Sequence, residues 1–314
     1  MEFIGEFAAI AAAFSWVVTA LVLASAGRNV GATVVNALRI WIAVFILLIV
    51  IYFSYGYVWP DINNNSLMYL AISGLIGLSI GDQFLYRALV DAGPRISTLV
   101  ITITPALTAV IAFDLLGESL HWSDVLGIAI TMLGIGIVVL GKDKKMNAEN
   151  YPHLKRGVAF AFIGALCQAF GLVFAKIGMQ STDPEVNSFH LSGASPLVAT
   201  YIRMCFGCIG ATIILGFYLA FRRNNVERKS IKLNKTLLCI FIGALFGPVL
   251  GVWLGLVSIK HIDTGVAATL MAISPILIIP FAKIFENEKI TYSSVFGAIV
   301  SIIGVTILVA WTPV

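Results

Sequence analysis

The sequence predicts an all-α, polytopic membrane protein of ten transmembrane helices, arranged as two inverted five-helix repeats. Hydrophobic residues make up 59% of the 314 residues and charged residues 11%, whereas soluble domains carry about 25% charged residues. The apolar residues form ten long runs, and landmarks of the first half recur in the second half at a constant offset. These observations indicate a duplicated chain that belongs in a bilayer.

Each of the ten apolar runs is long enough to cross the hydrocarbon core, which takes about 20 residues in a helix. These runs are about twice what a barrel strand requires, and in lipid a helix pairs all its own backbone N–H and C=O groups. We therefore expect one helix in each run. The predicted spans are residues 7–26, 34–55, 67–89, 96–116, 123–140, 157–179, 195–221, 237–259, 265–285 and 292–311.

The duplication is clearest between residues 74–118 and 243–288. The matched pairs, which all share one sequence offset, are Gly77/Gly247, Gly81/Gly251, Pro105/Pro275, Glu118/Glu288, Gly127/Gly297 and Gly134/Gly304. We divide the chain into a first repeat, residues 1–145, a basic linker, residues 146–156, and a second repeat, residues 157–314.

Five spans in each repeat require the second repeat to enter the membrane inverted relative to the first. The connections that follow odd-numbered spans hold 14 lysine and arginine residues, and the opposite side holds one, Lys260. Because cytoplasmic loops are enriched in these residues, we expect loops 142–156 and 222–235 in the cytoplasm and both termini outside.

The sequence argues against several kinds of partner. The net charge is +4, and most basic residues lie in two loops rather than on a surface that could follow a polyanion, so we expect no nucleic acid. The C-x-x-C pair, Cys205 and Cys208, lies inside a predicted span without a second pair at metal spacing, so we expect no metal. No phosphate-binding G-x-x-x-x-G-K-[ST] motif occurs that could couple ATP hydrolysis to transport. We also expect no cofactor.

Asp82 and Gln83 lie inside the third span, where ionisable groups are costly and usually face a cavity or a partner. Their repeat equivalents are Val252 and Trp253, so this polar pair breaks the internal symmetry. We expect Asp82 to bind a cationic group or to take up a proton during transport. The alternative is an aspartate neutralised by Arg87, Arg39 or backbone donors.

Trp16 in the first span and Gln168 in the sixth align as repeat equivalents near the middle of their helices. An amide and an indole suit a mostly apolar binding site with a few polar groups. We assign both, together with Trp253, to the candidate substrate site. Ordinary helix packing and interhelical hydrogen bonding is the alternative.

Five basic residues lie inside predicted spans. Arg39 lies near the basic end of its span, where its side chain could extend to the headgroups and anchor the protein, or could take part in a gate or an ion pair. Arg87 is four residues before Asp91, so the two could form an ion pair or a gate. Arg203 aligns with Arg39, which favours a shared structural role, with an anion contact as the alternative. The full set is Arg39, Arg87, Lys176, Arg203 and Lys283.

Pro105 and Pro275 each follow a hydroxyl residue in the middle of a span. Proline removes a helical hydrogen bond, so each is expected to kink its helix, either for movement or as fixed packing. The matched glycine pairs of spans five and ten flatten one helix face and favour close packing, with a homodimer contact as a further use.

Several short motifs together resemble the drug/metabolite transporter superfamily, specifically its EamA-type members. They are Phe14-Ser15-Trp16, Ala37-Leu38-Arg39, Tyr86-Arg87-Ala88-Leu89, Thr104-Pro105, Leu116-Gly117-Glu118 and Gly127 with Gly134, and the second half echoes them at Arg203, Ser274-Pro275, Glu288, Gly297 and Gly304. The resemblance implies a ten-helix basket around a central cavity lined mainly by spans 1, 3, 4, 6, 8 and 9. Familiar members keep both termini in the cytoplasm, which differs from the orientation expected here.

The resemblance also implies movement of a small metabolite across the cytoplasmic membrane. We expect a secondary transporter rather than an enzyme, driven by protons or exchange. One alternative is a membrane-embedded enzyme acting on a lipid-linked substrate, although the acids inside spans amount to Asp82 and the near-terminal Asp114. The other is a membrane sensor or scaffold that does not transport.

Overall fold

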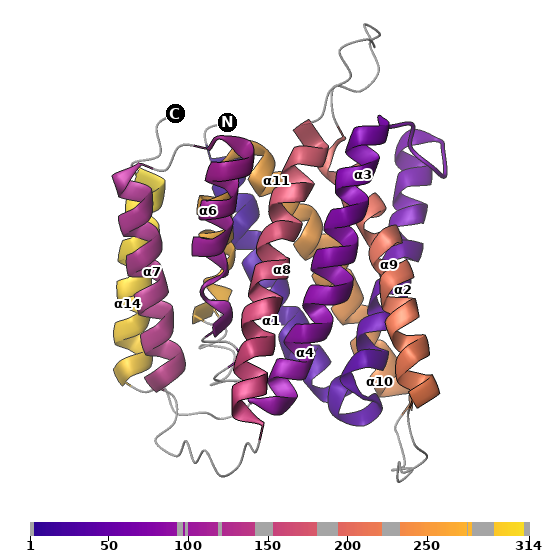
Figure 1. Ribbon diagram of the computed structural model, residues 1–314, viewed down its shortest axis with the longest axis horizontal. Coiled ribbons are helices and arrows are strands. Elements are labelled where there is room, and N and C mark those ends of the chain that lie inside the picture. Colours follow the sequence, from indigo (N-terminus) through magenta and orange to yellow (C-terminus); the bar gives the residue numbers. More distant parts are fainter. Residues whose placement is uncertain are drawn as a thin grey trace, which may run out of the picture.

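The computed structural model describes residues 3–92, 97, 100–118, 121–141, 153–180, 194–221, 233–274, 276–277 and 292–310. Every regular element in these ranges is helical (Figure 1). The first half contains α1 (Ile4–Val30), α2 (Ala32–Tyr55), α3 (Asn64–Ser73), η1 (Gly74–Gly81), α4 (Asp82–Asp91), α6 (Thr104–Leu116) and α7 (Trp122–Gly141). The second half contains α8 (Leu154–Gln180), α9 (Pro196–Phe221), α10 (Leu233–Ala244), η3 (Leu245–Gly251), α11 (Val252–His261), α12 (Thr264–Met271) and α14 (Tyr292–Ala310).

Each of the ten predicted spans contains a described helix. Five helices in the described residues are long and apolar enough to cross a bilayer, by length and composition: Thr33–Tyr55, Asn64–Ala88, Leu154–Gln180, Pro196–Phe221 and Asn234–His261. Four shorter apolar helices accompany them: Ile4–Thr19, Thr104–Leu116, Trp122–Ile137 and Val295–Ile307. Pro275, Lys283, Glu288 and most of loops 142–156 and 222–235 lie outside the described residues.

The third and eighth spans each contain a π-helical segment in the same place. Segment η1 ends at Gly81, and η3 ends at its repeat equivalent, Gly251. A π-segment widens a helical turn and is frequent at functional sites. The duplication therefore extends to this irregularity of the backbone.

The two halves interlock through these π-segments. A Cβ atom on Gly77 of η1 would lie 3.5 Å from the Gly171 Cα of α8. A Cβ atom on Gly247 of η3 would lie 3.0 Å from the Thr19 Cγ2 of α1. Since Thr19 and Gly171 correspond in the repeat alignment, α1 packs on η3 as α8 packs on η1. Each half thus contributes one helix to the packing of the other.

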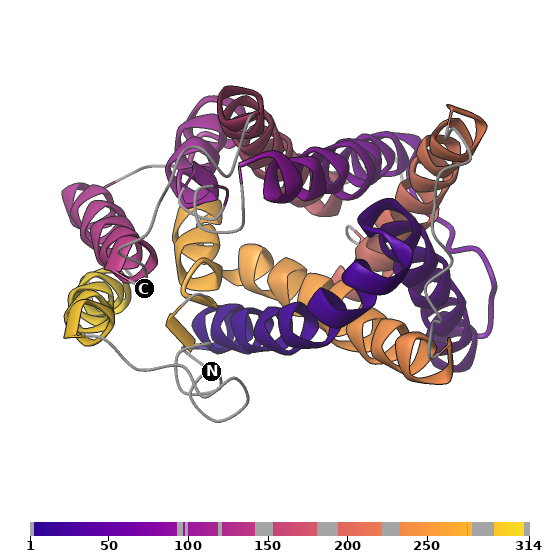
Figure 2. The ribbon, with the colours of Figure 1, turned by 90° about the horizontal axis from the view of Figure 1, so that it is seen from below.

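Helices α7 and α14 lie side by side at one edge of the bundle (Figures 1 and 2). A Cβ atom on Gly134 would meet Ser301, and one on Gly304 would meet Thr131. Thr131 and Ser301 are themselves repeat equivalents, and the Ser301 hydroxyl donates to the Thr131 carbonyl at 3.2 Å. The expected close packing of the glycine faces therefore occurs within one chain, and a homodimer contact stays a prediction.

Spans four and nine are interrupted at equivalent positions. The helical pattern breaks into a turn at residues 102–103 and again at residues 272–273. The Thr104 hydroxyl donates to the Ile101 carbonyl at 2.7 Å, and the equivalent Ser274 hydroxyl donates to the Met271 carbonyl at 3.0 Å. Pro105 lies in the first turn of α6, where its missing N–H costs no helical bond. Each break thus has a hydroxyl that satisfies a carbonyl released from the helix.

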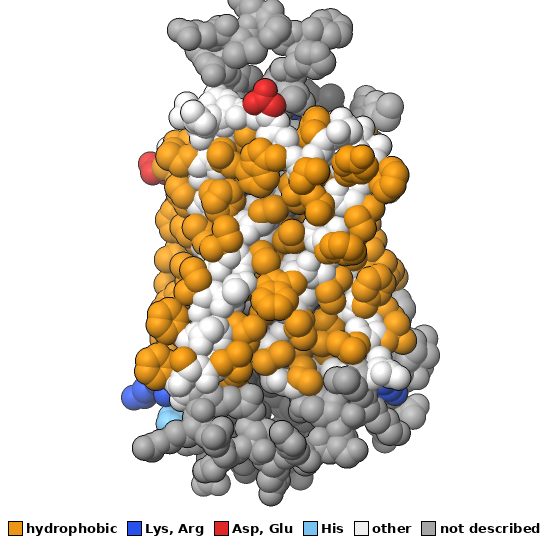
Figure 3. Space-filling view, turned by 90° about the vertical axis from the view of Figure 1, so that its right-hand side faces the viewer, with side chains coloured by type: hydrophobic (Ala, Val, Ile, Leu, Met, Phe, Trp, Pro, Cys, Tyr) orange, Lys and Arg blue, Asp and Glu red, His pale blue; other side chains and the backbone are white. Residues whose placement is uncertain are grey.

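The side face of the bundle is a broad apolar surface with charges confined to its ends. Figure 3 shows hydrophobic side chains over most of the height, Asp and Glu near the upper end, and Lys, Arg and His near the lower end. Large hydrophobic side chains are exposed on several helices of the bundle: Phe7 of α1, Phe53 of α2 and Trp122 of α7 are 71%, 82% and 81% exposed, respectively. An apolar surface of this extent suits acyl chains rather than water.

Candidate functional site

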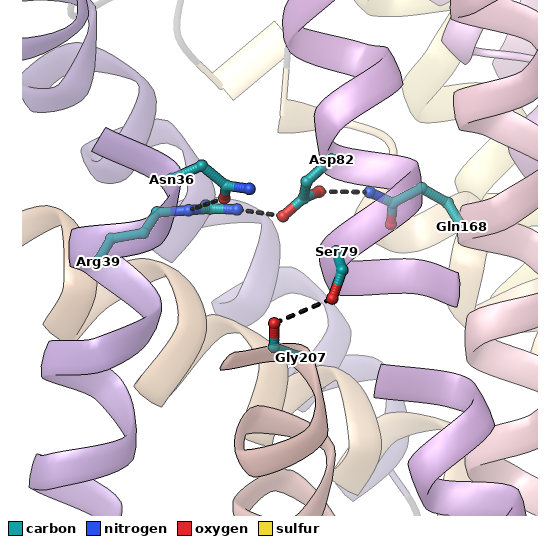
Figure 4. Close-up of polar contacts among 6 residues, drawn as sticks. All are labelled: Asn36, Arg39, Ser79, Asp82, Gln168 and Gly207. Carbon is teal, nitrogen blue, oxygen red and sulfur yellow. Dashed lines mark hydrogen bonds and ion pairs between the residues drawn. The ribbon is translucent and has the colours of Figure 1, made fainter. Parts of the chain in front are cut away.

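Asp82 is the first residue of α4, directly after η1, and is 6% exposed. Its Oδ1 accepts a hydrogen bond of 3.0 Å from Nε2 of Gln168 on α8. Its Oδ2 forms an ion pair with the guanidinium of Arg39 on α2 (Figure 4). The carboxylate is therefore held between one side chain of its own repeat and one of the other repeat.

The glycines of η1 bring α8 close enough for this contact. A Cβ atom on Gly81 would lie 2.9 Å from the Cys167 Cβ and 3.7 Å from the Gln168 backbone nitrogen. On the other side of η1, the Ser79 hydroxyl donates to the Gly207 carbonyl of α9 at 2.9 Å (Figure 4). The π-segment is thus clamped between two helices of the second repeat, immediately before Asp82.

Arg39 does not extend to the membrane surface, so the anchoring role is wrong, and the alternative of an ion pair with Asp82 is the arrangement that the structure has. Its side chain is 12% exposed. The Nε donates to Asn36 Oδ1 at 2.9 Å, and the guanidinium lies 5.6 Å from the centre of the Tyr86 ring. Inside the bundle the Arg39 guanidinium has three partners within reach: a carboxylate, an amide oxygen and an aromatic ring face. These contacts stabilise its positive charge better than an extension of the side chain to the headgroups would.

Arg203 on α9 is the second guanidinium in this region. It is 4% exposed and lies within electrostatic range of Asp82. Its Nη2 would be 3.6 Å from a Cβ atom on Gly77, so the guanidinium lies beside η1. Its buried Nε has no hydrogen-bond partner among the described residues. The structure therefore brings together Asp82, Gln168, Arg39 and Arg203 from four different helices.

The other predicted substrate residues have separate partners. Gln83 donates from Nε2 to the Thr33 hydroxyl at 3.3 Å, and its buried Oε1 has no partner among the described residues. The indole of Trp16 packs on η3, where its Nε1 would lie 2.6 Å from a Cβ atom on Gly251. Trp253 is half-buried on α11. In the described part of the chain, no hydrogen bond joins any of these three to Asp82.

The expected pair of Arg87 with Asp91 is replaced by a contact between α4 of the first repeat and α8, which begins in the basic linker and continues into the second repeat. Asp91 accepts two hydrogen bonds from Arg156 on α8, at 2.8 and 3.0 Å. This hydrogen bonding holds the pKa of the Asp91 carboxyl below its usual range, whereas the exposed Arg87 contributes through its charge alone. Helices α4 and α8 touch here, since a Cβ atom on Gly157 would meet Ala92, which places Arg156 beside Asp91.

A second contact between the repeats lies at the opposite end of the bundle. Lys176 on α8 forms an ion pair of 2.7 Å with Glu118, which follows α6. Lys176 also donates to the Ile262 carbonyl at 2.9 Å. Glu118 accepts from the backbone N–H and the hydroxyl of Thr264 at 2.7 and 2.6 Å, at the start of α12. Sequence reasoning assigned no role to Lys176, although an isolated lysine inside a span was a signal that a partner exists.

Comparisons with known proteins agree with this architecture. The model of the EamA-like transporter family matches residues 3–140 and again residues 155–310. An uncharacterized transporter of Clostridium kluyveri is 22% identical over 77% of this chain and 72% of its own length. The uncharacterized transporter YyaM of Bacillus subtilis is 23% identical over 86% of this chain and 81% of its own length.

One solved structure, described as the crystal structure of a protein, matches with a TM-score of 0.74 at 17% identity. The match covers 96% of this chain and 95% of the solved one, and at this identity it supports the fold alone. The two matches to the family model cover both predicted repeats, and the relatives carry the name of transporters. The chain belongs to the EamA-like transporter family.

Proposed function

We propose that this membrane transporter moves a small polar metabolite by alternating access, with Asp82 at the centre of its binding site. The observation that carries the proposal is the buried carboxylate of Asp82, shared between Arg39 of the first repeat and Gln168 of the second. Buried polar groups inside a membrane protein mark substrate and ion pathways. A change in the relative position of the repeats would alter this contact directly.

Ion pairs between the repeats at both ends of the bundle support the same mechanism. Asp91 binds Arg156 at the basic end, and Glu118 binds Lys176 at the other end. Rocking of one repeat against the other would open one of these contacts while the other stays closed. The equivalent helix breaks at residues 102–103 and 272–273 supply places where the backbone can bend.

The driving force in this proposal is a proton gradient or exchange of solutes. Asp82 is the acid within the Arg39 and Gln168 cluster, so it would carry any coupled proton. A substrate that binds here would displace Gln168 or Arg39 from the Asp82 carboxylate. Loss of the Gln168 hydrogen bond would weaken the contact between the two repeats at the binding site. We assign the transporter to the cell membrane, with the basic loops in the cytoplasm.

The test is uptake by liposomes that contain the purified protein. A mixture of small metabolites is applied outside, with and without an imposed pH gradient, and the contents of the liposomes are identified by mass spectrometry. We expect one or a few compounds to enter faster than into protein-free liposomes. Entry of no compound, together with chemical turnover of a lipid-linked substrate, would support the enzyme alternative instead.

A further inference from the structure

We infer that Arg203 binds an anionic group of the transported compound, and that the compound therefore carries a carboxylate or a similar single negative charge. This inference rests on the proposed function. It starts from the charges buried around Asp82, where two guanidinium groups, those of Arg39 and Arg203, share a single carboxylate. Among the described residues this cluster has one uncompensated positive charge.

The hydrogen bonds show which guanidinium lacks a partner. Arg39 is paired with Asp82 and Asn36, and the second oxygen of Asp82 is bound by Gln168. Arg203 is buried, with 4% of its surface exposed, and its Nε has no hydrogen-bond partner in the described part of the chain. Within the described residues, Arg203 interacts electrostatically with Asp82. Asp82, however, is already paired with Arg39.

The duplication explains how this imbalance arose. Arg203 corresponds to Arg39, so both repeats keep the arginine. The first repeat has Asp82 as its acid, whereas the equivalent position of the second repeat is Val252. The second repeat therefore retains a buried cation without the acid that accompanies it in the first.

An arginine keeps its positive charge in proteins. A buried charge without a partner is strongly unfavourable, so we expect its replacement by an apolar side chain of similar volume to be neutral or stabilising, as is often found when a buried ion pair is replaced. A bound carboxylate would supply two charge-assisted hydrogen bonds to the guanidinium and remove this penalty. The Arg203 guanidinium is thus suited to bind an organic monoanion.

The first test needs no ligand. Thermal unfolding of the purified protein is measured for Arg203→Met and Arg39→Met, with the exposed Lys155→Gln as a control for loss of a surface charge. We expect the melting temperature of Arg203→Met to equal or exceed that of the wild type by up to about 4 °C. Arg39→Met should melt several degrees lower, because it removes the direct partner of Asp82. A melting temperature of Arg203→Met as low as that of Arg39→Met would overturn the inference.

The second test uses matched acids and amides as probes: butyrate with butyramide, phenylacetate with phenylacetamide, and L-leucine with L-leucinamide. We expect at least one acid, but not its amide, to raise the melting temperature of the wild type. Arg203→Gln should weaken that binding about 10- to 100-fold, while Arg203→Lys should retain part of it and Lys155→Gln all of it. Equal effects of acid and amide, no effect of any acid, or undiminished binding by Arg203→Gln would each contradict the inference.

These results are separable from the fate of the proposed function. If uptake by liposomes fails but the acids bind through Arg203, the anion site stands and the transport proposal falls. If a compound without a negative charge is transported and Arg203→Gln transports it normally, the transport proposal stands and the anion site falls.

Discussion

The ion pair between Glu118 and Lys176 allows a quantitative prediction about what joins the two repeats. Glu118→Ala removes three contacts at once: the 2.7 Å ion pair with Lys176 and the two hydrogen bonds to Thr264. The side chains of Lys176 and Glu118 are 8% and 11% exposed, so the pair is buried. Removal of one partner from a buried pair costs about 3–5 kcal/mol, against about 0–1 kcal/mol for an exposed pair.

The assay is unfolding in mixed micelles, followed by circular dichroism, for the wild type, Glu118→Ala, Lys176→Met and the double variant. We expect each single variant to lose about 3–5 kcal/mol of unfolding free energy, since each leaves one buried charge without its partner. The double variant should lose clearly less than the sum of the two, because no buried charge then remains unpaired. The interpretation of a buried ion pair between the repeats would be refuted if each single variant lost less than about 1 kcal/mol of unfolding free energy and the loss in the double variant equalled the sum of the two.

Three further predictions concern other parts of the molecule. Burial and the neighbouring Glu118 carboxylate raise the pKa of Asp263 above its usual value, so its ionised form disfavours the folded state. Asp263→Asn should therefore be more stable than the wild type at neutral pH. This gain in stability should vanish as the pH falls below about 3.9, the pKa of the aspartate in the unfolded chain. The measurement is thermal melting as a function of pH, and a gain in melting temperature that does not depend on pH would contradict the prediction. Gly134→Ala should destabilise the protein, because its Cβ would meet the α14 backbone. As a control, the Cβ of Gly216→Ala would meet no atom within 4 Å, so this variant should be more stable than the wild type by about 0.5–1 kcal/mol. Equal effects of the two substitutions on stability would argue against the packing of α7 on α14. A single cysteine introduced in loop 142–156 should resist an impermeant thiol reagent in intact cells and react after lysis, and labelling of intact cells would reverse the proposed orientation.

Much of the fold could be predicted because it depends on patterns along the chain. Bilayer thickness sets the length of each apolar run, so hydropathy alone locates the helices. A constant offset between the repeats predicts which segments are equivalent, and the structure confirms it at Thr131 with Ser301, which meet across α7 and α14. The π-segments could not be predicted, because nothing in their apolar composition distinguishes them from ordinary helix.

The candidate site was harder to predict because it depends on which helix faces meet. Asp82 and Gln168 were each identified as unusual polar residues within a span, but their hydrogen bond joins residues 86 positions apart. Arg39 was considered both as an anchor at the membrane surface and as a partner of Asp82, and the structure shows the pair with Asp82. Asp91 was assigned to Arg87, four residues before it on the same helix, whereas close packing of α4 on α8 brings Arg156 to it. For Asp91 the error lies in choosing a partner, not in recognising that a partner was needed.

The central claim is that the Asp82 carboxylate is the functional centre of the transporter. The most direct measurement is the initial rate of substrate uptake by liposomes containing Asp82→Asn, compared with wild type and with Lys155→Gln at equal protein content. Melting temperatures recorded on the same preparations show whether each variant is folded. We predict that Asp82→Asn is folded but loses uptake, or loses its dependence on the pH gradient, while Lys155→Gln behaves as wild type. Uptake by folded Asp82→Asn at the wild-type rate and with the wild-type pH dependence would contradict the account.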